Sequence, residues 1–422
     1  MRTRSRSRRA IAVIGGALMS ALVLAGCSFG GEVEADDAPV QSTASFSDET
    51  VQQMTDAVTH AMTTTGSSGA IVGVWAPWSG SWVTGVGAQR PDGGGEVTAD
   101  QVFRAGKVTR AMTCDVLYEV AAEGIVKLGD SVADYVSGVP DLADVSLSEL
   151  CDGTSGIGSY GTQLYPLWLS NPERRWDPRY LASFGLGQPR TTEPGVAYRD
   201  SDAGYVLLGL ALERATGATA ADLIERYVAG PLALEATALG PLPDSGVLQG
   251  GQAVNNAEGV LDCAAPVDLT GVSATTGFTD GGVVTDIEDL GRYVQALATG
   301  RLVEDDDRFG DPVPVAPDAP TWLNADGGAI IAGSLVGQYG KVPGYLTAAF
   351  ADPATGLTVA VVLNSSTASA AIGEYLAWEL AAIASKTPAA DGETAPDAGL
   401  PWTPEQYHEA IAAAAVCAPP AA

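Results

Sequence analysis

The chain is poor in the residues that most metal sites use. It has two histidines, His60 and His408, far apart in the sequence, and its five cysteines include no C-x-x-C pair. Zinc sites draw their ligands mainly from closely spaced cysteines and histidines. No Gly-rich loop lies between a strand and a helix where it could cradle a phosphate. The sequence therefore predicts neither a metal site nor a nucleotide or other cofactor.

Basic residues are also scarce. The chain has 22 Lys and Arg against 51 Asp and Glu, a formal net charge of −29. Several of the arginines stand within the first ten residues, so the rest of the chain is still more acidic. A protein with this charge balance repels polyanions. Nucleic acid is therefore excluded as a partner, and the scattered acids are interpreted as a solubilising shell.

No apolar run is long enough for a comfortable membrane span. The longest, from Ala10 to Gly26, follows a basic segment and is typical of a secretory signal peptide, which we place at residues 1–26. It ends in "LAGC", which resembles the bacterial lipobox, so Cys27 is expected to be lipidated and to become the first mature residue. A plain secretory signal with an incidental cysteine is the alternative. The expected location is extracytoplasmic, with the lipid held in the outer face of the cell membrane.

Without Cys27 the chain keeps an even number of cysteines in an oxidising compartment. This predicts two disulfides, for which three pairings exist. The four cysteines are Cys114, Cys151, Cys263 and Cys417.

Composition divides the exported part into three segments. Residues 27–45 are small, polar and acidic and are expected to form a flexible tether. Residues 46–386 begin with an amphipathic helix and two short strands, continue with helical patterns to about residue 228, and end with strands and a long helix. This order predicts an α+β domain, in which an antiparallel sheet is closed by its own termini around an inserted helical region. Residues 387–422 form a linker and a short helix, and residues 301–326, which include the acidic run 304–307, are expected to be an exposed Pro-rich loop.

Five stretches, in order, resemble the serine β-lactamase-related family, which includes class C β-lactamases and D-alanyl-D-alanine carboxypeptidases. The resemblance implies a β-lactamase or penicillin-binding-protein-like fold, with an antiparallel sheet flanked by terminal helices and an inserted all-helical region. The stretches are "VFRAGKVTRAMTCDVLYEVAAEGIVKLGDSVADYV" (102–136), "VSLSELCDGTSGIGSY" (145–160), "EPGVAYRDSDAGYVLLGLALERATG" (193–217), "TTGFTDGGVVTDIEDLGRYVQALATG" (275–300) and "VGQYGKVPGY" (336–345).

The family's catalytic groups are replaced at every motif. Lys107 stands where the family has its serine nucleophile, and Arg110 stands at the place of its lysine base. In the Tyr-Ser-Asn motif, only the middle serine is kept. The residues there are Asp200, Ser201 and Asp202, and the His-x-Gly or Lys-Thr-Gly triplet of the last strand reads Gln338, Tyr339 and Gly340.

These replacements argue against hydrolysis. An amine at Lys107 could attack only an activated carbonyl and would leave a stable amide, and the guanidinium of Arg110 stays protonated and cannot act as a base. Glycines of the scaffold, such as Gly106 and Gly340, are kept. The sequence therefore favours a lipid-anchored pseudoenzyme that binds a cell-wall peptide or an envelope protein. An active serine hydrolase with a displaced nucleophile, such as Ser201 or Thr109, and a purely structural envelope lipoprotein are the alternatives.

The replacements are balanced in charge, since two cations and two carboxylates stand in positions that the family fold brings to one pocket. We therefore expect an ion-pair cluster of Lys107 and Arg110 with Asp200 and Asp202; the alternative is that they point independently into solvent. The same likeness places Cys114 and Cys151 on elements that pack together. It leaves Cys417 to tie down the C-terminal tail by bonding Cys263.

Overall fold

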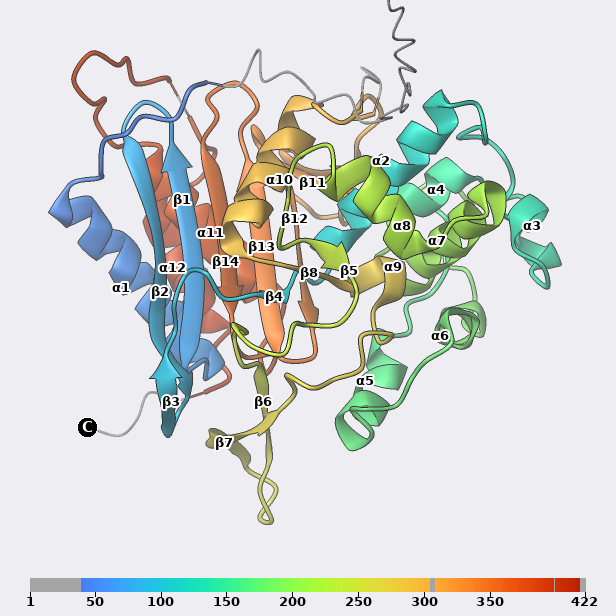
Figure 1. Ribbon diagram of the computed structural model, residues 1–422, viewed down its shortest axis with the longest axis horizontal. Coiled ribbons are helices and arrows are strands. Elements are labelled where there is room, and N and C mark those ends of the chain that lie inside the picture. The colour runs from blue at the N-terminus through green and yellow to red at the C-terminus, as the bar shows by residue number, and fades with distance from the viewer. Residues whose placement is uncertain (1–38, 304–307, 398, 418–422) are drawn as a thin grey trace, which may run out of the picture. The chain divides into compact units, whose positions relative to one another are not determined.

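The strand-rich stretches at the two ends of the domain meet side by side in the computed structural model, which describes residues 39–303, 308–397 and 399–417 (Figure 1). They form an antiparallel sheet in the order β3-β2-β1-β14-β13-β12-β11-β10-β9. Its strands are β1 (Gly69–Ala76), β2 (Gly80–Arg90), β3 (Gly93–Glu96), β9 (Val313–Pro314), β10 (Leu323–Asp326), β11 (Ala329–Ala332), β12 (Leu335–Val342), β13 (Tyr345–Ala351) and β14 (Thr358–Leu363). The pairing of β1 with β14 joins the first and last strands that the structure describes, as the sequence predicts.

The central strands are apolar throughout because both faces of the sheet are covered. In β1, Ala70, Val72 and Val74 point to one hydrophobic core and Ile71 points to the other, the alternation that a strand imposes. The first core lies under α1 (Asp48–Thr65), α11 (Ala371–Ala384) and α12 (Pro404–Ala413). Helix α10 (Ile287–Thr299) packs on the opposite face (Figure 1).

Between β3 and α10 the chain forms the expected helical region, with two small sheets. The helices are α2 (Val108–Ala122), α3 (Val132–Tyr135), α4 (Leu147–Cys151), α5 (Gly161–Ser170), α6 (Pro178–Leu186), α7 (Asp202–Thr216), α8 (Ala220–Ile224) and α9 (Phe278–Gly281), with single turns η1 (Pro140–Leu142) and η2 (Glu225–Ala229). The small sheets comprise β4 (Phe103–Arg104), β5 (Ala238–Leu239) and β8 (Val283–Thr285), and β6 (Gly251–Asn255) with β7 (Leu261–Asp268). This is the α+β, β-lactamase-like architecture that the family resemblance implies.

The C-terminal tail packs onto the domain. Trp402, Tyr407 and Ile411 are buried against α11 and α1. The disulfides are Cys114–Cys151 and Cys263–Cys417, the pairing favoured above, and the second fixes the end of the tail beside the C-cap of α1. The packed unit therefore continues beyond residue 386.

The prediction of an exposed loop over residues 301–326 is wrong in part. Val313–Pro314 and Leu323–Asp326 form strands β9 and β10 at the edge of the sheet, and Arg308 is buried in an ion pair with Asp115. Strands of two to four residues are too short to show hydrophobic periodicity. The acidic, Pro-rich composition of this stretch therefore predicts a loop instead. Residues 304–307 lie outside the described residues.

The signal peptide, Cys27 and most of the tether also lie outside the described residues. Within the described part, the structure contains no helix with the length and apolar character of a membrane span.

Helix α11 buries Glu374 between the sheet and its neighbours. Only 5% of this residue is exposed to solvent. Burial raises the pKa of Glu374 from its ordinary 4.5 to about 8, although a hydrogen bond with Tyr339 opposes the rise. The folded protein therefore holds this proton over a pH range in which the unfolded chain has released it.

This predicts that the free energy of unfolding falls as the pH rises between about 4.5 and about 8, because the unfolded state binds fewer protons there. Glu374→Gln, which cannot ionise, should remove up to about 1.4 kcal/mol of that fall per pH unit. The measurement is urea unfolding of both proteins across this range. Glu409→Gln, on the exposed side of α12, is the control and should change nothing. Parallel pH curves for Glu374→Gln and the parent would contradict a buried, protonated Glu374.

Candidate functional site

The site begins where β4 passes into α2. Gly106 takes a left-handed backbone conformation, with φ of +59°, and Lys107 occupies the N-cap position of the helix. Strand β12 approaches this turn so closely that a Cβ on Gly340 would lie 2.5 Å from Cβ of Lys107. Glycine at 340 therefore lets the sheet pack directly behind Lys107.

The amine of Lys107 points toward the start of α7. Its Nζ lies 2.8 Å from Oδ2 and 3.0 Å from Oδ1 of Asp200, and 3.2 Å from Oδ1 of Asp202. The Lys107 side chain is 20% exposed. Its positive charge is thus shared between two carboxylates from one turn of chain.

Arg110 lies one helical turn further along α2 and is the centre of the cluster. Its side chain is 1% exposed, and Nε, Nη1 and Nη2 each donate to a different carboxylate at 2.7 Å. The acceptors are Oδ1 of Asp280, Oδ1 of Asp200 and Oδ1 of Asp202. The guanidinium also lies 4.6 Å from the ring centre of Tyr205, a cation–π contact.

The outer oxygens of the buried carboxylates are held as well. Oδ2 of Asp202 accepts from the hydroxyl of Ser159 and from the backbone N–H of Gly161, the latter at 2.9 Å. The hydroxyl of Tyr160 donates to Oδ2 of Asp280 at 3.1 Å. The cluster is therefore an almost fully satisfied polar network, the condition under which buried charges are tolerated.

The sequence predictions missed Asp280, Ser159 and Tyr160. Asp280 is the one charged residue in "TTGFTDGGVV" (275–284), which was the available signal. The charges of the two cations and two carboxylates predicted from the sequence already cancel, so they did not indicate a third acid. Only the packing of α9 against α2 and α7 shows that Arg110 has a third partner.

The charges within the cluster reinforce one another. Burial and the neighbouring Arg110 would lower the pKa of Lys107, but three aspartates outweigh them and raise it above its ordinary value. Burial alone would also lower the pKa of Arg110, yet the same carboxylates hold it well above the usual range. Both groups therefore stay protonated, so neither can serve as a nucleophile or a base near neutral pH.

The aspartates differ in how far they are ionised. Burial would raise the pKa of Asp200, but Arg110 and Lys107 hold it well below its usual value, in keeping with a side chain that is 53% exposed beside two cations. Burial raises the pKa of Asp280 to about 6 despite its bond to Arg110. Asp280 therefore takes up a proton more readily than Asp200 does.

The remaining candidate residues lie elsewhere. The Ser201 hydroxyl caps α7, since it accepts from the N–H of Gly204 at 3.0 Å and donates to the carbonyl of Gly158 at 3.1 Å. Thr109 donates to the carbonyl of Gly106 at 2.8 Å. Gln338 turns toward β11, with Nε2 donating to the carbonyl of Gly328 at 3.0 Å. None of these hydroxyls has a base beside it among the bonds described, and Gln338 does not join the cluster.

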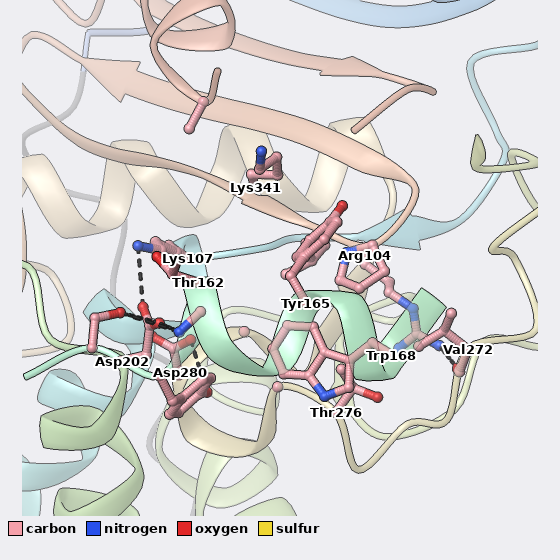
Figure 2. A pocket seen from close by; sticks show the side chains of 18 of the residues that line it. Arg104, Lys107, Thr162, Tyr165, Trp168, Asp202, Val272, Thr276, Asp280 and Lys341 are labelled. Carbon is pink, nitrogen blue, oxygen red and sulfur yellow. Dashed lines mark hydrogen bonds and ion pairs between the residues drawn. The ribbon is translucent and has the colours of Figure 1, made fainter. Parts of the chain in front are cut away.

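A cavity of about 580 Å³ adjoins the cluster. Figure 2 shows Lys107, Asp202 and Asp280 at one end and Arg104 and Val272 at the other, with Tyr165 between them and Trp168 along the floor. Lys341 of β12 reaches in from the sheet side. In the part of the chain that the structure describes, no group of histidines, cysteines and acids could hold a metal ion.

Comparisons with known sequences agree with this architecture. The family model described as "Beta-lactamase" matches residues 54–382. The curated D-alanyl-D-alanine-carboxypeptidase/endopeptidase AmpH of Escherichia coli (strain K12) is 28% identical over 168 residues. That match covers 37% of this chain and 42% of AmpH, so the chain spans less than half the length of this relative.

Solved structures share the fold over most of the chain. A D-stereospecific amidohydrolase from Streptomyces sp. has a TM-score of 0.66 and 22% identity, over 78% of this chain and 97% of that one. The D-amino acid amidase from Ochrobactrum anthropi SV3, solved with L-phenylalanine amide, has a TM-score of 0.66 and 18% identity, over 78% and 96% of the two chains. At these identities the likeness shows the fold alone.

Arg110 is predicted to be the residue whose loss costs most stability. In Arg110→Met the buried Asp202 and Asp280 lose their shared cation, which should lower the free energy of unfolding by about 3–5 kcal/mol at neutral pH. The loss should shrink on acidification, because the unpaired carboxyls take up protons in the folded state.

Lys107→Met is the matched comparison, since its partner Asp200 is half exposed and keeps Arg110. It should cost only about 1 kcal/mol. Urea unfolding of both variants at two pH values measures the difference. Equal losses, or a loss in Arg110→Met that grows in acid, would show that the cluster is not centred on Arg110.

Proposed function

The chain belongs to the beta-lactamase family, and we propose that within it this protein is a non-hydrolysing member, a lipid-anchored protein of the cell envelope that binds a cell-wall peptide. The observation that carries the proposal is the guanidinium of Arg110 at the position of the family's catalytic base, held by three carboxylates. A group in that state cannot accept a proton from a nucleophile.

The nucleophile position supports the same conclusion. Lys107 donates to Asp200 and Asp202, and its amine stays protonated, so it has no free electron pair with which to attack a carbonyl. Thr109 and Ser201 spend their hydroxyls on helix-terminal hydrogen bonds. The described contacts place no base beside either of these two hydroxyls.

The cavity favours a binding role over a purely structural one. At about 580 Å³ it has room for a small ligand or the end of a peptide. The named relatives act on D-alanyl-D-alanine peptides or on D-amino acid amides. A peptide end of that kind fits such a cavity better than the broad surface of a folded envelope protein, which remains the second kind of partner to test.

The absence of turnover is the first prediction from this proposal. The protein should not be labelled by a fluorescent penicillin and should not hydrolyse a chromogenic cephalosporin or a D-alanyl-D-alanine peptide. Lys107→Ser alone should also be inactive, because Arg110 still cannot accept a proton. Turnover by the unchanged protein that is abolished by Ser201→Ala or Thr109→Ala would instead establish a hydrolase with a displaced nucleophile.

The second prediction from this proposal concerns the lipid anchor. Cys27→Ala should stop lipidation, so that the protein is released from the membrane fraction or accumulates with residues 1–26 attached. Fractionation of cells and mass spectrometry of the mature N-terminus measure this. Cys263→Ser, which removes a cysteine of the folded domain, is the control and should leave membrane attachment unchanged. An unmodified soluble product of the parent chain, cleaved elsewhere, would refute the anchor.

A further inference from the structure

Two of the chain's four lysines, Lys107 and Lys341, line the same cavity but are held differently. Nζ of Lys107 lies 2.8 Å from one aspartate and 3.2 Å from another. Lys341, on β12, forms no ion pair with an acid of residues 39–303, 308–397 and 399–417. Its Nζ donates to the backbone carbonyl of Ala368 at 3.2 Å. Within the described chain, the amine of Lys341 therefore faces the cavity without a carboxylate to fix its proton.

An aromatic surface lies beside this amine. Nζ of Lys341 is 5.3 Å from the centre of the Tyr165 ring, which in turn packs edge to face on Trp168 at 5.9 Å (Figure 2). The Tyr165 hydroxyl donates to Oε1 of Gln252 at 2.6 Å and lies 2.7 Å from Oγ of Ser366. These bonds hold the ring in place. A small organic molecule in the cavity would thus meet a fixed apolar face next to the amine of Lys341.

This placement disfavours the charged form of the amine. Burial lowers the pKa of Lys341, and the positive charge of Lys107 lowers it further. Lys107 behaves in the opposite way, because its aspartates raise its pKa. A lysine that is desolvated beside another cation gives up its proton more easily and becomes a nucleophile. Of the two lysines of the cavity, Lys341 is therefore the one that can present a free electron pair.

We propose that Lys341 binds aldehydes covalently, as a reversible imine, with the apolar body of the aldehyde against the ring of Tyr165. The cavity, at about 580 Å³, has room for a small organic aldehyde. Amines of lysine form imines with carbonyl compounds when they are not protonated. This reactivity is separate from the peptide binding proposed above, and it requires neither a serine nucleophile nor a base at the positions of Lys107 and Arg110.

The covalent step uses only the amine, the aldehyde and water. The electron pair of the neutral Nζ forms a bond to the carbonyl carbon, and the π electrons of the C=O bond move to the oxygen. One proton of Nζ passes through water to that oxygen, which gives a carbinolamine. The hydroxyl group then leaves as water with the second proton of Nζ, and the electron pair of the nitrogen completes the C=N bond. Nothing is oxidised or reduced, and the addition of water reverses the step.

The test treats the whole protein at neutral pH with benzaldehyde and cyanoborohydride, which reduces an imine to a stable secondary amine. Peptide mapping by mass spectrometry gives the labelling rate of each lysine. Lys341 should be labelled at least about tenfold faster than the exposed Lys127 and Lys386, because its amine is deprotonated more easily and the aromatic face holds the probe. Lys107 should stay unlabelled. Labelling of Lys341 no faster than that of the exposed lysines, or preferential labelling of Lys107, would overturn the proposal.

Three variants identify the reactive group. Lys341→Arg keeps the positive charge but cannot form an imine, so the fast labelling should disappear, whereas Lys386→Arg, the matched control at an exposed lysine, should keep it. Lys107→Met removes the neighbouring cation and should slow the labelling of Lys341 at least about threefold at neutral pH, and the two rates should converge at alkaline pH.

Fast labelling that persists in Lys341→Arg would refute the proposal. An unchanged rate in Lys107→Met would contradict the electrostatic activation on which it rests. These rates are independent of peptide turnover, so hydrolysis would refute the proposed function without deciding this one.

Discussion

The guanidinium of Arg110 is the interaction on which the site depends. It bonds acids from the start of α7 and from α9, so one side chain of α2 ties three segments of the helical region together. A guanidinium presents donors in a fixed planar fork, and here each of three carboxylates receives one of them. This arrangement stabilises the fold, because each carboxylate that contacts the guanidinium is charged and oriented toward it. It suits proton transfer poorly, since the central group never gives up its proton.

The same network shows how charged residues are accommodated at the motif positions of a β-lactamase-like scaffold. Gly106 and Gly340 keep the close approach of β12 to the start of α2, so the pocket retains its shape. Within it, Lys107 and Arg110 would each be costly if buried alone. Their carboxylates arrive on separate elements, and Ser159, Tyr160 and the N–H of Gly161 satisfy the outer oxygens. The cluster is best understood as a single unit.

The cluster pairs both of its cations, Lys107 and Arg110, at one end of the cavity. Arg104 of β4 and Lys341 of β12 also line this cavity, and each donates a hydrogen bond to a backbone carbonyl.

Much of the fold follows from the sequence, because it is written in local patterns. Helix α1 runs from its Ser47 cap to Gly66, β1 and β14 alternate between two cores, and the order of five stretches identifies the architecture. The short edge strands β9 and β10 and the burial of Arg308 could not be read, because two to four residues carry no period. At the site, the sequence determined that serine and lysine are missing and that two cations and two acids replace the family's groups. Only the tertiary structure decided that Asp280 is the third partner of Arg110, and that Arg104 and Lys341 form no ion pair with an acid of the described residues. Pairing of charges far apart in sequence depends on which helices and strands pack together, and packing is a property of the whole chain.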